Sequence, residues 1–354
     1  MKRTGSGSVL AATGILALFC ALGLGARGQT TPGTAAQQLV ILDTDIGDDI
    51  DDAFALALLL QSPEIKLLGV TTAYGNTELR MQLVERYLNA VGRGEIPVTA
   101  GEQTPAKNMF TQAAYARQGG NPAGDRCTPQ SVSQLPQRAQ ERYKSCEKDR
   151  HDAAGFLLRA IQAHPGEITL IAIGPLFNVQ AAIARDAATF RKLKRVVIMG
   201  GSVYRGYDAG TPGTAQPPSP EWNILCDPAG ARALLASGVP VFVMPLDSTQ
   251  IHMAPQELAT ILSHGSPLSD QLALLYHQWT GAETWRMPTL FDPLAVSYTL
   301  RPELCPMRPI HLDIDEQGYT KPGPGAANAQ VCLKSEEERF RAFLLERILG
   351  DTGK

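Results

Sequence analysis

Six aspartates occur within ten residues of this 354-residue chain, in the segment from Asp43 to Asp52. Carboxylates this close together repel one another unless a cation neutralises them. Several hard oxygen ligands in one place are typical of sites for Ca²⁺ or Mg²⁺, so the segment predicts a divalent-cation site. The alternative is that the acids only cap a following helix, whose first N–H groups favour negative charge.

Two other acidic motifs begin in a similar way. An EF-hand loop counted from Asp43 needs glycine at its sixth place and glutamate at its twelfth, where this chain has Asp48 and Phe54. A phosphotransferase of the haloacid dehalogenase type begins with a strand followed by Asp-x-Asp, with Asp43 as the nucleophile. That type normally has Thr or Val at the position of Gly47. The EF-hand is therefore rejected, and the phosphotransferase is kept as a weaker alternative.

The elements around the acidic segment alternate between strands and helices. Apolar runs predict buried strands at 39–42, 67–72, 168–173, 196–199 and 241–246. Helical patterns occupy 53–60, 78–91, a segment from about 178, 229–237 and 336–349, and residues 310–319 alternate like a small hairpin. This order predicts an α/β fold with a mostly parallel central sheet flanked by helices and a Rossmann-like core. Ligands bind beyond the carboxyl ends of such strands, which is where the acidic segment lies.

The N-terminus has a composition of its own. Two basic residues precede an apolar run over 9–24, and small residues follow it, which is the order of a secretory signal peptide. The run contains glycines and is short for a stable membrane span. We expect a signal peptide at 1–28, a linker at 29–38 and a single catalytic domain at 39–349, with a surface insertion at about 108–150. The protein is then secreted or periplasmic.

The cysteines agree with export to an oxidising compartment. Cys127 and Cys146 lie in one polar stretch, and Cys305 and Cys332 flank the expected hairpin, so both pairs are candidates for disulfides. Cys226 is then left as a buried thiol. The alternative is that all five are free, and their spacing matches no zinc site.

Charge and composition limit the kind of partner. The formal net charge is −3 and 44% of the residues are hydrophobic, which suits a large α/β domain. A charge this close to zero gives no reason to expect a nucleic acid or an anionic membrane as partner. We expect a small molecule instead, and formation of a homo-oligomer is left open.

Short motifs along most of the chain then resemble one known family. They are Asp43-x-Asp45-x-Gly47, Asp51-Asp52-Ala53, Gly75-Asn76, Gly174-Pro175-Leu176-Phe177-Asn178, Met199-Gly200-Gly201, Glu221-Trp222-Asn223, Asp227-Pro228 and Asp292-Pro293-Leu294-Ala295. Their types and order resemble the inosine–uridine nucleoside hydrolase family, whose first signature is Asp-x-Asp-Pro-Gly-x-Asp-Asp-Ala. Each piece alone is weak, but together they cover roughly 39 to 349 in the right order.

The resemblance implies a calcium-dependent enzyme that hydrolyses the N-glycosidic bond of a nucleoside and releases ribose and a free base. Asp45 would bind Ca²⁺ and take the proton from the attacking water. Asp52, Asp292 and the backbone carbonyl of Ile173 would be the other protein ligands, with the 2′ and 3′ hydroxyls of ribose. The residues implied to hold the sugar are Asp51, Asn76, Met199, Glu221 and Asn223.

The acidic segment departs from the family signature by two extra residues. Counted from its first aspartate, the alignment makes Asp49 a metal ligand; counted back from Ala53, it selects Asp51 and Asp52. We favour the second alignment, because Asp-Asp-Ala runs directly into the predicted helix.

A second departure concerns the leaving base. Many members of the family have histidine before the last aspartate, where it can protonate a purine, but this chain has Phe291 beside the base. Other candidates for that acid are Tyr204, Tyr207, Tyr276, His277 and Arg286, although each is more often a packing or surface residue. Trp279 and Trp285 are candidates for stacking on a heterocycle. Two further hypotheses remain: hydrolysis of another riboside, and a non-catalytic calcium-dependent ribose-binding protein.

Overall fold

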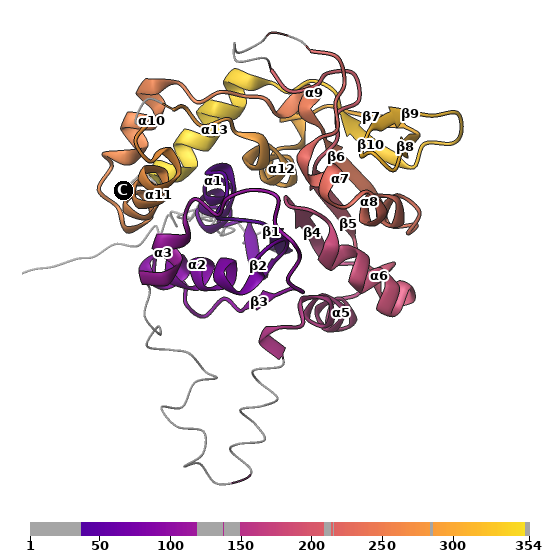
Figure 1. Cartoon of the computed structure of the whole chain (residues 1–354), viewed down its shortest axis with the longest axis horizontal. Helices are drawn as coiled ribbons and strands as arrows, with labels where there is room; N and C mark the ends of the chain where they lie inside the picture. The colour runs from indigo at the N-terminus through magenta and orange to yellow at the C-terminus, as the bar shows by residue number, and fades with distance from the viewer. Residues whose placement is uncertain are drawn as a thin grey trace, which may run out of the picture. The chain divides into compact units, whose positions relative to one another are not determined.

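An eight-stranded sheet forms the centre of the fold (Figure 1). The strands, in spatial order, are β3 (Val98–Ala100), β2 (Ile65–Thr72), β1 (Gln38–Thr44), β4 (Thr169–Ala172), β5 (Arg195–Met199), β6 (Val241–Met244), β10 (Ala329–Cys332) and β7 (Met307–Ile310). Every pair is parallel except β10 with β7. The prediction of a mostly parallel central sheet is confirmed.

This computed structural model describes residues 37–118, 137, 149–208, 214, 216–283 and 286–350. These residues belong to the unit Ala36–Lys354, which is separate from Met1–Ala35. Several predictions lie outside the described residues: the signal peptide, nearly all of the linker, most of the insertion at 108–150, the Cys127–Cys146 pair and Trp285. Among the described helices none is long and apolar enough to cross a membrane.

Helices cover both faces of the sheet. One apolar core gathers α1 (Asp51–Leu60), α2 (Thr77–Ala90), α11 (Pro267–Thr280), α12 (Phe291–Leu300) and α13 (Glu337–Leu349), and the other gathers α5 (Ala153–Ala163), α6 (Phe177–Phe190) and α8 (Pro228–Leu235). Figure 1 shows the two groups on opposite sides of the strands. Along β1, Val40 and Leu42 enter the first core and Ile41 the second, because successive side chains of a strand point to opposite faces. Burial on both faces explains why residues 39–42 of β1 are all apolar.

The C-terminal part differs most from the prediction. The expected hairpin at 310–319 exists as β8 (Leu312–Ile314) paired with β9 (Thr320–Pro322), but its return strand begins later. The flanking strands β7 and β10 extend the main sheet, which the sequence did not predict. The disulfide between Cys305 and Cys332 is present, whereas Cys226 is half-buried and free.

The first part of the expected insertion is packed against the body of the protein. Gln112 is fully buried, and its side chain donates a hydrogen bond to the backbone oxygen of Asp49 at 2.7 Å. The helix α3 (Ala113–Gln118) contributes Tyr115 to the core, and the Tyr115 hydroxyl donates to Gln271 at 2.6 Å. Residues 108–118 are therefore not a surface appendage.

Candidate active site

The acidic segment joins the end of β1 to the start of α1. Asp51 and Asp52 form the first turn of α1, where carboxylates face the free N–H groups of the helix. The Thr44 hydroxyl donates to Asp52 Oδ1, and the Ile46 amide donates to the same hydroxyl at 3.1 Å. The last residue of the strand thus fixes the rotamer of an aspartate eight positions later.

A third aspartate reaches the same place from the far end of the chain. Asp292 lies in the first turn of α12, which packs against α1, and its amide donates to Asp51 Oδ2 at 3.2 Å. Asp51, Asp52 and Asp292 are buried, and one oxygen of each lies within 4.8 Å of the others. Two oxygens bound to one Ca²⁺ are separated by at most about twice the metal–oxygen distance, roughly 4.6–5.2 Å. The spacing therefore fits one divalent cation.

The electrostatics of this cluster also favour a cation. Burial raises the pKa of Asp51, Asp52 and Asp292 well above the usual range, and the negative charges of neighbouring aspartates raise each pKa further. Without a cation, these carboxyls therefore hold their protons more tightly than isolated aspartates do. A divalent ion would oppose that effect, since its charge favours the ionised carboxylates.

Asp45 lies directly after β1 and faces the segment that follows β4. Burial raises its pKa to about 7, while the Arg80 guanidinium opposes the shift. A side chain at Gly174 would bring a Cβ within 2.7 Å of Asp45 Oδ1, so only glycine allows this approach. Ile173, whose carbonyl was predicted as a ligand, precedes this glycine and lines the same cavity.

One buried arginine organises the extra residues of the acidic segment. Arg80 of α2 is 1% exposed, and its guanidinium donates to the backbone oxygens of Asp45 and Ile46. It also contacts Asp48 Oδ2 at 2.7 Å, and the Phe110 ring lies 4.8 Å from its Cζ. The inserted Asp48 is thus neutralised by Arg80, which leaves Asp51 and Asp52 for the cluster with Asp292.

On the other side, the loop after β5 meets the helix α7 (Trp222–Cys226). Glu221 caps α7 and accepts hydrogen bonds from the amides of Gly201, Asn223 and Ile224 at 2.9 to 3.1 Å. Burial raises the Glu221 pKa to about 7, although these amides lower it. The Asn223 side chain donates to the carbonyls of Ile173 and Met199 at 3.0 and 3.2 Å. This side of the site is rigid and rich in acceptors for hydroxyl groups.

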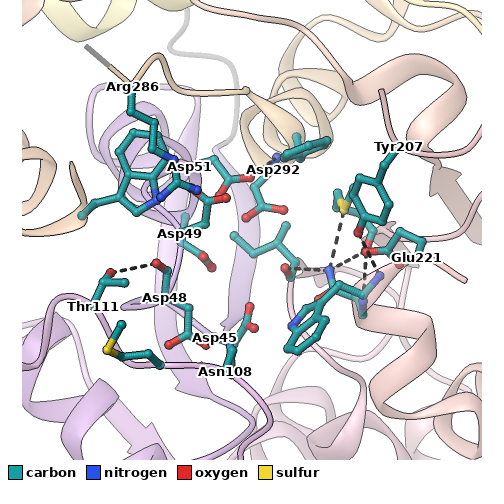
Figure 2. A pocket seen from close by; sticks show the side chains of 18 residues that line it. Asp45, Asp48, Asp49, Asp51, Asn108, Thr111, Tyr207, Glu221, Arg286 and Asp292 are labelled. Atoms are coloured by element: carbon teal, nitrogen blue, oxygen red, sulfur yellow. Dashed lines mark hydrogen bonds between the residues drawn. The ribbon is translucent and has the colours of Figure 1, made fainter. Parts of the chain in front are cut away.

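These groups surround one cavity of about 360 Å³ (Figure 2), a volume in the range of small-molecule sites. It opens beyond the carboxyl ends of β1, β4 and β5. Its described lining residues are Asp45, Asp48, Asp49, Asp51, Asp52, Asn108, Met109, Thr111, Ile173, Met199, Tyr207, Glu221, Trp222, Asn223, Trp279, Arg286, Phe291 and Asp292. Carboxylates spaced for a cation and acceptors for hydroxyl groups lie in one cavity, and this combination suits the hydrolysis of a sugar derivative.

The chain matches the model of the family described as inosine-uridine preferring nucleoside hydrolase over residues 40–342. It belongs to that family. Uridine nucleosidase 1 of Arabidopsis thaliana is 29% identical, with 79% of each chain covered, and the non-specific ribonucleoside hydrolase RihC of Escherichia coli is 29% identical over 87% of this chain and 97% of the relative. The fold is similar to that of a plant nucleoside hydrolase, PpNRh1, with a TM-score of 0.69, 24% identity and coverage of 88% and 99%. The prediction of an N-ribosyl hydrolase is confirmed at the level of the family.

Most of the predicted site residues of this nucleoside hydrolase lie together. Asp45, Asp51, Asp52, Ile173, Met199, Glu221, Asn223, Phe291 and Asp292 all line the cavity. Asn76 does not, because its side chain accepts a hydrogen bond from the Leu79 amide at 3.0 Å and caps α2. The sequence motif places Asn76 after the right strand, but the local helix cap determines where its side chain points.

The structure also separates the alternatives within the acidic segment. Asp51 and Asp52, rather than Asp49, gather with Asp292.

Asp43 is fully buried and does not line the cavity; its Oδ1 accepts hydrogen bonds from Thr71 at 2.5 Å and Asn178 at 2.7 Å. Asp43 thus has no access to a substrate in this cavity, which argues against the phosphotransferase.

The candidates for the leaving-group acid divide clearly. Tyr207 and Arg286 line the cavity, whereas Tyr204, Tyr276 and His277 are not among its lining residues. The Tyr207 ring packs edge-on against Phe291, with ring centroids 6.2 Å apart. Phe291 therefore belongs to an apolar surface and, as expected, supplies no proton.

Sequence reasoning missed four residues of the site. Arg80 resembled an ordinary helical surface residue, and only its contact with the acidic segment shows its role. Asn108, Met109 and Thr111 fell within the expected insertion, yet they line the cavity. Asn108 Nδ2 donates to Asp48 Oδ2 at 2.5 Å, and the excess charge of the acidic segment was the available signal that such partners were needed.

Proposed function

We propose that this nucleoside hydrolase requires Ca²⁺ to cleave the N-glycosidic bond of ribonucleosides, releasing ribose and a free base. The supporting observation is the convergence of Asp51, Asp52 and Asp292, from two distant segments, within 4.8 Å in a sugar-sized cavity. Calcium suits this set because every candidate ligand is an oxygen and the carboxylates are several.

Asp52 and Asp292 of this cluster would hold the ion together with Asp45 and the carbonyl of Ile173, which line the same cavity, and Asp51 would be left for the sugar. When bound, Ca²⁺ supplies positive charge that orients the ribose diol and makes a water more acidic. Asp45 takes the proton of the attacking water, which suits a buried carboxylate that lines the cavity beside the metal site. General-base help of this kind contributes about 10²–10⁴-fold.

The remaining residues bind and orient the sugar. Asp51, Glu221 and Asn223 present acceptors to its hydroxyls, and Met199 packs beneath the ring. As the bond to the base breaks, positive charge develops on the sugar, and the buried carboxylates around it stabilise that charge. The fixed hydrogen bonds of Glu221 keep its oxygens in place during this change.

A reducing-sugar assay over purine and pyrimidine ribosides tests the proposal. We expect ribose release that a chelator abolishes and that Ca²⁺ restores better than Mg²⁺. Asp45→Asn should reduce kcat by at least about 10²-fold, and the exposed Asp270→Asn on α11 is the matched control. Calcium-dependent ribose binding without release from any riboside would contradict hydrolysis and indicate a ribose-binding protein instead.

We also propose that the protein is exported, with the catalytic domain of residues 39–349 following a cleaved segment. The basic, apolar and small-residue order of 1–28 supports this. The Cys305–Cys332 disulfide supports it as well, since such bonds persist in oxidising compartments. N-terminal sequencing of the protein recovered outside the cytoplasm should begin near residue 29; an intact N-terminus on cytoplasmic protein would refute export.

A further inference from the structure

One cationic side chain lies among seven carboxylates in the described lining of the cavity. The cation is Arg286, and the acids are Asp45, Asp48, Asp49, Asp51, Asp52, Glu221 and Asp292. Carboxylates suit the positive charge that develops on the sugar. They oppose the negative charge that collects on the departing base, because like charges repel in a water-poor site. The base therefore needs a positive partner of its own.

Arg286 is held in place by the end of α11. Its Cζ lies 4.0 Å from the centroid of the Trp279 ring, and Trp279 is buried. The Tyr276 hydroxyl donates to the backbone oxygen of Arg286 at 2.9 Å. Stacking on an aromatic face leaves the N–H groups at the rim of the guanidinium available to a ligand. The arginine is thus oriented although its side chain is exposed.

Arg286 lies at the opposite end of the cavity from Glu221. Figure 2 shows Arg286 on one side of Asp51 and Asp292, and Tyr207 and Glu221 on the other. Ribose carries its base and its 5′-hydroxymethyl group on opposite sides of the ring oxygen. A ribose whose diol lies at the central carboxylates and whose 5′-hydroxyl is held by Glu221 would direct its base toward Arg286.

We propose that Arg286 is a catalytic residue that stabilises the negative charge on the departing base. This inference rests on the proposed function and assigns a role that Phe291 cannot perform. Tyr207 is less suited, because its hydroxyl accepts the Trp222 amide at 3.0 Å on the Glu221 side.

The bond to the base can break without a proton from a protein acid. The bond between C1′ and the base nitrogen breaks, and its electron pair moves onto the base and spreads to a conjugated ring carbonyl. The oxygen of water bonds to C1′ and its proton passes to Asp45. The base leaves as an anion paired with Arg286 and takes a proton from solvent afterwards.

Leaving-group dependence tests the proposal. The substrates are uridine and inosine, whose bases leave poorly, and 4-nitrophenyl riboside, whose leaving group needs little help. Arg286→Gln should lower kcat/KM for both nucleosides by about 10²-fold, the usual loss for one transition-state donor. The loss on the nitrophenyl riboside should stay below about fivefold, and Arg286→Lys should recover part of the nucleoside activity because it restores the charge. Arg339→Gln, at an exposed position on α13, is the matched control.

Each outcome is decisive. Equal losses on all three substrates would overturn the proposal, because a defect in folding or ribose binding affects every riboside alike. Unchanged nucleoside activity in Arg286→Gln would overturn it as well. A wild-type protein that releases ribose from none of the substrates would refute the proposed function itself, and this inference with it.

Discussion

Without the proposed metal, the stability of this protein should fall as the pH rises. In the metal-free folded protein, burial raises the pKa of Asp43 to about 6 and the pKa values of Asp45 and Glu221 to about 7. These carboxyls ionise near pH 4 in the unfolded chain. Between about pH 4 and pH 7 the folded state therefore binds more protons than the unfolded state, and the free energy of unfolding decreases with increasing pH.

The size of the effect follows from the shifts. For Asp45 alone, a change from 3.8 to about 7 corresponds to about 4 kcal/mol, at 1.36 kcal/mol per pKa unit. The proposed Ca²⁺ would bind the ionised carboxylates, so its stabilising effect should be much larger near pH 8 than near pH 5. Asp292→Asn removes one repelling charge and one ligand. This variant should be more stable than wild type near pH 8 without metal, and Ca²⁺ should stabilise it little.

Urea unfolding gives the free energy of unfolding under four conditions: near pH 5 and near pH 8, each with chelator and with Ca²⁺. The difference between wild type and Asp292→Asn isolates the cluster from other titrating groups. If the chelated wild type were no less stable near pH 8, or if Ca²⁺ stabilised it equally at both pH values, the reasoning about this cluster would be refuted.

Three substitutions test other parts of the structure. Arg80→Met leaves Asp48 without its buried partner, so the free energy of unfolding should fall by about 3–5 kcal/mol in urea unfolding; a loss below about 1 kcal/mol would contradict this role. Gly47→Ala places a Cβ against the Phe110 ring at a φ of +127°, and it should weaken calcium binding measured by calorimetry; unchanged affinity would show that the loop tolerates the change. Cys305→Ser should cost about 3 kcal/mol, and a reductant should bring the wild type to the same stability; a variant as stable as the oxidised wild type would exclude a stabilising bond.

The fold was predictable in the part of the chain where buried strands alternate with helices. Residues 39–42 of β1 form a continuous apolar run, and such a run indicates a strand buried on both faces of a sheet. The strands β7 and β10 were missed because neither contains an uninterrupted apolar run, and their pairing depends on distant partners. No local pattern shows that β10 adds to β6 while β7 runs antiparallel at the edge.

The site was predictable where a motif fixes both the chain position and the direction of the side chain. Asp51 and Asp52 open a helix whose first turn faces the cavity, so the motif placed them correctly. Asn76 also opens a helix, but its side chain turns back to cap that helix. Arg80 shows the opposite failure, since a helical arginine is usually exposed and nothing nearby in sequence indicates a buried contact with Asp48.

Calcium titration of the full chain by calorimetry, with and without ribose, tests the central claim most directly. The account predicts one Ca²⁺ per chain, an affinity that increases when ribose is present because its diol completes the coordination, and loss of binding in Asp292→Asn. A protein that binds no Ca²⁺, or whose affinity is the same with and without ribose, would contradict a metal that holds the sugar.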